Sequence, residues 1–160
     1  MERDFLLQAS DGELSALCRL EFSRGSGNGG QKRNKTSSAA RVVLLEDERF
    51  AAEDCSERSQ HQNRARALWK LRRLIAFEVR VSPATPPARI ECALTHGEYP
   101  CNLAHLFDIL EEQNYDHKSA ASLCGVTTSA FLKLLKRDEE AWTRVNAARE
   151  SRNLYKLKVN

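Results

Sequence analysis

A glycine-rich loop followed by basic residues is the segment of this sequence best suited to chemistry. Residues Gly25 to Gly30 formally satisfy G-x-G-x-x-G and follow an alternating polar and apolar stretch at 19–23. In a dinucleotide-binding fold the motif must open an apolar helix, but Gln31 to Thr36 are polar and basic. A P-loop is excluded as well, because no Gly-Lys-Ser/Thr closes the segment. We therefore expect no nucleotide at this loop and predict no cofactor.

Positive charge is concentrated around the same loop. The chain of 160 residues has 25 Lys+Arg against 22 Asp+Glu, and this net charge of +3 identifies no partner by itself. Between Arg24 and Arg41, however, every charged residue is basic: Arg24, Lys32, Arg33, Lys35 and Arg41. A loop of this kind either binds a polyanion or is a solvated surface loop, and charge alone leaves both interpretations open.

The order of the residues favours the first interpretation. Ser26-Gly27-Asn28-Gly29-Gly30-Gln31, followed by Asn34-Lys35-Thr36, Ser38-Ala39 and Arg41, resembles the signature of the peptidyl-tRNA hydrolase domain of class I peptide chain release factors. Downstream, Glu57-Arg58-Ser59-Gln60, Asn63 and Ala67 match the segment that opens the long helix of that domain. The resemblance covers residues 19–75 and looks closest to the small rescue hydrolases that carry this domain without a codon-reading domain.

The resemblance implies a ribosome-dependent enzyme that hydrolyses the ester between a nascent peptide and tRNA. Gly29, Gly30 and Gln31 would be the catalytic residues: the glycines would allow unusual backbone conformations, and the Gln31 N–H would donate to the oxyanion or the leaving oxygen. Peptidyl-tRNA and the ribosomal RNA of the peptidyl-transferase centre would be the partners. The RNA-binding residues implied are Arg24, Ser26, Lys32, Arg33, Asn34, Lys35, Thr36, Arg41, Arg58, Gln60, Arg66, Lys70 and Arg73. For those on the helix, a merely solvated charged face remains open.

The elements that must position these residues form an α+β domain over 1–80. We expect a short helix capped by Asp11, strands at 19–23, 41–45 and 49–55, and a long helix over 59–79. Leu68, Leu71 and Ile75 recur at helical spacing and would pack on a small, mostly antiparallel sheet, with Arg66, Lys70 and Arg73 on the opposite side.

The remainder of the chain reads as a second, all-α domain. A proline-rich linker is expected at 81–97, a helix-turn-helix domain at 98–152 and a basic tail at 153–160. Asn102 and Asp116 are the expected helix caps, and Gly125 would make the turn between two helices. RNA or ribosome docking, DNA binding and simple packing remain open for this domain. The tail either enters the mRNA channel or docks on the helices through Leu154, Tyr155 and Leu157.

Composition limits the other classes. No uncharged apolar run approaches the roughly 20 residues of a membrane span, and no signal peptide is apparent at the N-terminus. The five cysteines and four histidines show no metal-ligand spacing, and a disulfide framework is not expected. We expect a cytoplasmic monomer that acts without a codon-reading domain. The alternative is a non-catalytic regulator that grips RNA or DNA with the basic loop and the helix-turn-helix.

Overall fold

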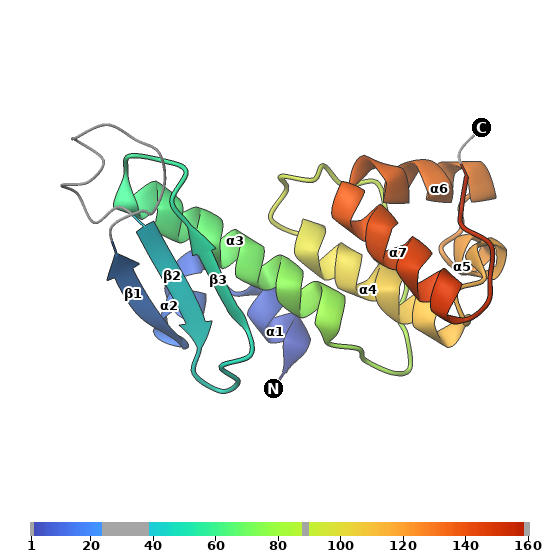
Figure 1. The fold of residues 1–160 in the computed structure, drawn as a ribbon. Helices are drawn as coiled ribbons and strands as arrows, with labels where there is room; N and C mark the ends of the chain where they lie inside the picture. The colour runs from blue at the N-terminus through green and yellow to red at the C-terminus, as the bar shows by residue number, and fades with distance from the viewer. Residues whose placement is uncertain (1, 24–38, 88–89, 159–160) are drawn as a thin grey trace. The chain divides into compact units, whose positions relative to one another are not determined.

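The fold was analysed in a computed structural model that describes residues 2–23, 39–87 and 90–158 (Figure 1). The described residues form seven helices and three strands, and they divide into two compact units, Met1–Ile75 and Ala76–Asn160. The helices are α1 (Arg3–Gln8), α2 (Asp11–Ala16), α3 (Gln60–Glu78), α4 (Tyr99–Glu112), α5 (His117–Leu123), α6 (Thr128–Arg137) and α7 (Glu139–Ser151). The strands are β1 (Cys18–Ser23), β2 (Ala39–Leu44) and β3 (Ala51–Asp54). None of the helices in the described ranges has the length and apolar character needed to cross a membrane.

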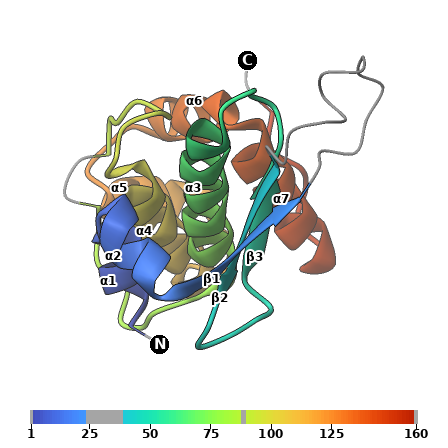
Figure 2. The same cartoon turned by 90° about the vertical axis from the view of Figure 1, so that its left-hand side faces the viewer.

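The sheet is antiparallel and has the order β1-β2-β3. Alternation along β2 orients Ala40, Val42 and Leu44 toward one face, where they are buried, whereas Arg41 is exposed on the other. The face formed by Ala40, Val42 and Leu44 belongs to the core of the N-terminal unit. In the same unit α3 runs alongside the strands (Figure 2). This arrangement confirms the predicted α+β class with a small antiparallel sheet and one long helix.

Helix α3 follows the predicted range closely. Leu68, Leu71 and Ile75 are completely buried, because their helical spacing places them on a single stripe. Arg66 and Lys70 are exposed, as expected, but Arg73 is only half-exposed. The neighbouring Arg72 is buried and its guanidinium donates to Asp11 Oδ1 at 2.8 Å and to the Ala9 carbonyl at 2.7 Å, so it stabilises the N-terminal helices.

The N-terminal helices differ from the prediction. Ser10, not Asp11, caps α2, because Ser10 and Glu13 form a reciprocal capping box in which each side chain accepts from the other residue's backbone N–H. Asp11 is the first residue inside the helix. Helix α1 was not predicted, since six residues provide too short a stretch for helical periodicity to be recognised.

The C-terminal unit contains helices α4 to α7. Asn102 was wrongly expected to be a cap: α4 begins at Tyr99, three residues earlier, and Asn102 is buried inside it. Asp116 does cap α5, because its carboxylate accepts from the Lys118 and Ser119 N–H groups. Gly125 has a φ of +67°, which is the left-handed conformation expected for the turn before α6.

The segment after α7 lies on the helices of the same unit. Arg149 is buried, and its Nε donates to the Tyr155 carbonyl at 2.8 Å. The Leu157 N–H donates to Asn146 Oδ1 at 2.7 Å, and the Leu157 side chain is buried, whereas Tyr155 is exposed. Of the residues expected to dock, Leu157 is thus buried and Tyr155 is not, and entry into the mRNA channel stays a prediction.

Candidate functional site

The segment that carries Gly-Gly-Gln connects two neighbouring strands. β1 ends at Ser23, β2 begins at Ala39, and these two residues are directly paired in the antiparallel ladder. The backbone ends of the segment 24–38 are therefore held side by side. The predicted site residues within it lie outside the described residues: Arg24, Ser26, Gly29, Gly30, Gln31, Lys32, Arg33, Asn34, Lys35 and Thr36.

Predicted residues from a second segment reach the same end of the sheet. Ala40, at the start of β2, pairs with Asp54, the last residue of β3. The chain then passes through 55–59 into the first turn of α3, and Arg58 and Gln60 are exposed there. The antiparallel ladder thus brings Arg58 and Gln60 to the end of the sheet from which the segment 24–38 departs.

Asn63 fixes the approach to this helix. Its side chain is fully buried; Oδ1 accepts from the Glu57 N–H at 2.8 Å and Nδ2 donates to the Glu57 carbonyl at 2.9 Å. The two hydrogen bonds pair the amide with both backbone groups of a single residue. Asn63 therefore holds the 57–60 turn, including Arg58, against α3, which is a structural role that the sequence motif did not reveal.

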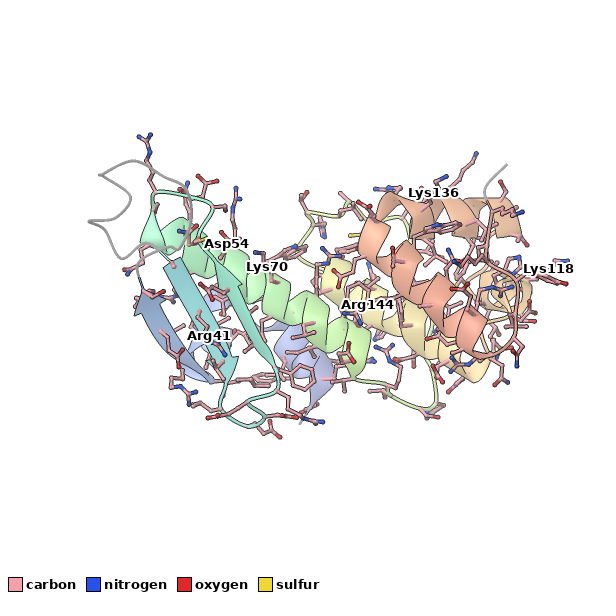
Figure 3. The ribbon with its side chains drawn as sticks, in the orientation of Figure 1. Arg41, Asp54, Lys70, Lys118, Lys136 and Arg144 are labelled. Carbon is pink, nitrogen blue, oxygen red and sulfur yellow. The ribbon has the colours of Figure 1, made fainter. Side chains whose placement is uncertain are left out.

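The two exposed cations of α3 are paired with acids at the end of β3 and just after it. Arg66 Nη2 lies 2.6 Å from Glu57 Oε1, and its Nη1 donates to Ser56 Oγ at 2.8 Å. Lys70 Nζ lies 2.8 Å from Asp54 Oδ2 and donates to the Glu53 carbonyl at 2.9 Å. Asp54 and Lys70 point toward one another in Figure 3. Sequence reasoning missed these partners, because nothing in the spacing links β3 to the second turn of α3.

The pKa of Asp54 reflects this pairing. Burial alone would raise the pKa of the carboxyl group, but hydrogen bonds from Lys70 and Ser56 outweigh burial and lower the pKa from 3.8 to about 2. The Asp54 side chain is 5% exposed, whereas that of Lys70 is 54% exposed. The pair therefore stabilises the junction of β3 and α3 with a largely buried carboxylate and a solvated ammonium.

The Asp54–Lys70 pair predicts an acid-dependent loss of stability. Because the pKa is lower in the folded chain than the ordinary value of 3.8, the carboxylate stabilises the fold above pH 3.8, and this contribution disappears as the pH falls toward 2. We expect it to amount to about 1–2 kcal/mol, since solvent screens the exposed ammonium. Denaturant unfolding at several pH values should show this decrease for the wild type and a smaller one for Asp54→Asn. The control Glu53→Gln, which removes the adjacent exposed acid, should keep the wild-type decrease; equal pH profiles for Asp54→Asn and wild type would contradict the prediction.

Arg41 lies apart from the Asp54–Lys70 pair. Arg41 is exposed on the sheet face opposite to Val42, and its Nε lies 3.5 Å from Glu21 Oε2. Figure 3 shows Arg41 on the sheet at a distance from the Asp54–Lys70 pair. Arg73 is half-buried on α3. Of the predicted RNA-binding residues that the structure describes, Arg66 and Lys70 thus contact the end of β3 and the turn after it, Arg58 and Gln60 lie at the start of α3, and Arg41 lies on the opposite face of the sheet.

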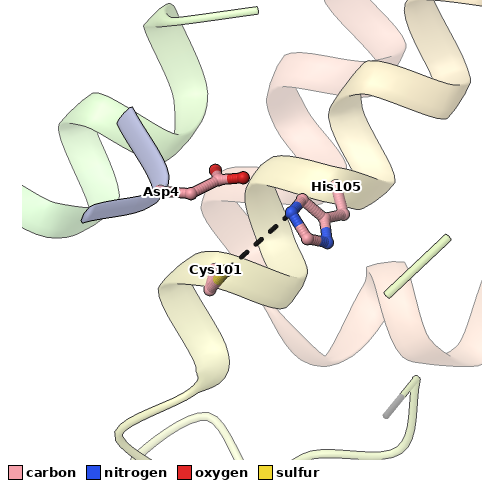
Figure 4. A group of neighbouring side chains, drawn as sticks. All are labelled: Asp4, Cys101 and His105. Carbon is pink, nitrogen blue, oxygen red and sulfur yellow. Dashed lines mark hydrogen bonds between the residues drawn. The ribbon is translucent and has the colours of Figure 1, made fainter. Parts of the chain in front are cut away.

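All five cysteines are free thiols. Cys101 and His105 lie one turn apart on α4, with Cys101 Sγ 3.9 Å from His105 Nε2 (Figure 4). The i, i+4 spacing of this pair was not noticed in the sequence, although it places two residues on one helix face. Figure 4 also draws Asp4, a residue of the N-terminal unit.

Comparison with known proteins identifies the domain. The family model described as the RF-1 domain matches residues 14–92, a range that contains the three strands, the Gly-Gly-Gln segment and α3. The chain carries an RF-1 domain. This assignment confirms the resemblance to the hydrolase domain of class I release factors. The three-stranded sheet and α3 are therefore elements of an RF-1 domain.

Relatives of the chain are peptide chain release factors. The chain is 48% identical over 61 residues to peptide chain release factor 2 of Paramagnetospirillum magneticum, covering 38% of this chain and 16% of that protein. It is 44% identical over 87 residues to peptide chain release factor 1 of Leptothrix cholodnii, covering 52% and 24%. With peptide chain release factor 1 of Delftia acidovorans it shares 30% identity over 143 residues, covering 89% and 38%, so that this alignment extends into the C-terminal unit.

These similarities cover part of each relative. The chain spans between 16% and 38% of the length of these three release factors. No solved structure matches the chain.

Proposed function

We propose that this protein hydrolyses the ester of peptidyl-tRNA on the ribosome. The observation that carries the proposal is the position of Gly29-Gly30-Gln31 in an RF-1 domain, between two strands whose ends are paired at Ser23 and Ala39. The named relatives are peptide chain release factors, which supports peptide release as the reaction. The ribosome and peptidyl-tRNA would then be its partners and the cytoplasm its location.

The chemistry needs few groups from the protein. Ester hydrolysis requires a water molecule at the carbonyl carbon and a donor for the oxyanion that develops. In our proposal the backbone N–H of Gln31 is that donor, its side chain positions the water, and the ribosomal RNA and the substrate ribose supply the remaining contacts. The basic residues between Arg24 and Arg41, with Arg58, would bind RNA phosphates around the site.

We further propose that the activity is independent of the codon, as in ribosome rescue. The order of residues around Gly29-Gly30-Gln31, which resembles that of the small rescue hydrolases, supports this proposal. The protein would then act wherever its RF-1 domain reaches the peptidyl-transferase centre, without a stop codon in the decoding site.

Peptide release from programmed ribosomes tests both parts of the proposal. We expect release from ribosomes stalled at the end of a truncated mRNA, and no acceleration when a stop codon is placed in the decoding site. The same protein should leave free peptidyl-tRNA intact, because the isolated chain lacks the RNA groups that complete the site. Release only with a stop codon would refute the rescue proposal, and absence of release in every condition would refute the hydrolase proposal.

A further inference from the structure

Helix α6 presents a cationic face. Phe131 and Leu135 are completely or nearly completely buried on one side of the helix. The opposite side, at i, i+4, i+7 and i+8, carries four exposed residues, Ser129, Lys133, Lys136 and Arg137, which we call the α6 cationic face. One side of α6 thus packs in the core of the C-terminal unit while the other offers three positive charges to solvent.

Helix α6 itself contains no acid, and Asp138, Glu139 and Glu140 follow directly after its last residue. From His117 to Arg137 the sequence contains Lys118, Lys133, Lys136 and Arg137 but no aspartate or glutamate. Within the described part of the chain, no carboxylate forms an ion pair with Lys133, Lys136 or Arg137.

Elsewhere in the same unit, four basic side chains are paired with acids. The partners are Arg80 with Asp108 at 3.3 Å, Arg144 with Glu78 at 2.7 Å, Arg152 with Glu111 at 2.6 Å and Lys156 with Glu150 at 3.0 Å. These four pairs cancel charge, whereas Lys133 and Lys136 of the α6 cationic face have no carboxylate partner among the described residues.

The side-chain types on α6 suit phosphates better than bases. Lysine and serine commonly contact phosphate oxygens, whereas adenine edges are read by Asn or Gln and guanine edges by a bidentate Arg or Lys. α6 contains no Asn or Gln, and Arg137 Nη2 is directed to the Cys92 carbonyl at 3.5 Å. Half-buried Trp142 on α7 lies beside the face, with Lys136 Nζ 5.9 Å from its ring centroid, and provides an aromatic surface next to the charges.

We propose that the α6 cationic face binds the phosphate backbone of RNA without reading its sequence. The choice of RNA over duplex DNA rests on the proposed function, which places the protein on a ribosome. Three observations support binding to phosphates: the charge of the face is complementary to that of RNA, the face contains no acid, and α6 has no Asn or Gln that could read a base. The C-terminal unit would then be a second RNA contact beside the RF-1 domain.

The test compares two double variants of the full chain that lose the same charge. Lys133→Gln/Lys136→Gln removes two lysines of the face. Lys118→Gln/Lys156→Gln removes two exposed lysines elsewhere in the same unit, and Figure 3 shows Lys118 and Lys136 well separated. Affinity for a labelled RNA hairpin is measured by fluorescence anisotropy at several salt concentrations. Circular dichroism checks that all variants fold.

We expect the face variant to bind the hairpin roughly tenfold more weakly, or worse, near physiological salt. Its plot of log affinity against log salt should be shallower by about 1–2, since each lost phosphate contact removes about 0.7–0.9 from the slope. The control should bind within about twofold of wild type. In a Trp69→Phe background, RNA should also change the fluorescence of Trp142.

Three results would overturn the proposal: equal affinity of wild type and face variant, an equal loss in both double variants, or tighter binding to duplex DNA than to RNA of the same sequence. Failure of the α6 proposal can be distinguished from failure of the proposed hydrolase function, because peptide release is measured in a separate experiment. If wild type releases no peptide but the face variant alone loses RNA affinity, the hydrolase proposal fails and the α6 proposal stands. If release occurs and both double variants bind RNA equally, the reverse holds.

Discussion

Replacing Gln31 by proline is expected to lower the rate of peptide release by about 10²–10³-fold or more, because proline removes the backbone N–H that is proposed to stabilise the oxyanion. Gln31→Ala keeps that N–H and removes only the group that positions water. It should therefore release peptide more slowly than wild type, by roughly ten- to a hundredfold, but faster than the proline variant. Single-turnover release from ribosomes stalled on truncated mRNA gives these rates directly.

Co-sedimentation with ribosomes separates lost chemistry from lost binding. Both Gln31 variants should sediment with ribosomes as wild type does, since they retain every basic residue of the loop and of α3. The control Gln62→Ala removes an exposed polar side chain from α3 and should release peptide at the wild-type rate. Wild-type release by Gln31→Ala and Gln31→Pro alike would show that Gln31 takes no part in the chemistry. Ribosome binding without peptide release would instead support the alternative function, a non-catalytic regulator that binds RNA or DNA.

Replacing Asn63 by alanine is expected to destabilise the RF-1 domain by about 2–4 kcal/mol. The variant leaves the Glu57 N–H and carbonyl without their partner, and each unsatisfied buried group costs about 1–3 kcal/mol. Urea unfolding monitored by circular dichroism measures the free energy of unfolding. Gln62→Ala, one residue earlier but exposed, is the matched control and should lie within about 0.5 kcal/mol of wild type. If the two variants were equally stable, Asn63 would not fix the 57–60 turn.

Much of the fold could be predicted because its signals are local. Leu68, Leu71 and Ile75 define a helical stripe by spacing alone, and Asp116 stands where a cap is needed before a short helix. The errors have local causes as well. Asn102 was chosen as a cap for its type, but α4 begins earlier at Tyr99, with Pro100 in its first turn.

Less of the site could be predicted, because its contacts join residues that are distant in sequence. Spacing indicated that Arg66 and Lys70 share a helix face, yet it gave no sign that Glu57 and Asp54 pair with them. Those partners depend on the register of β3 against β2, which fixes where the chain turns into α3. The Gly-Gly-Gln signature, in contrast, was recognisable from residue order alone, and the family match confirms the domain that it indicated.

The pairing of Ser23 with Ala39 also bears on how this sequence can vary. Insertions between 24 and 38 leave the ladder of β1 and β2 in register, and doubling the length of a loop closed in this way costs only about 0.6 kcal/mol in chain entropy. One residue inserted between Ala40 and Leu44 would instead turn Val42 or Leu44 to the sheet face that carries Arg41 and disrupt the packing of both faces. Related sequences should therefore tolerate changes in length on one side of Ala39 and resist them on the other.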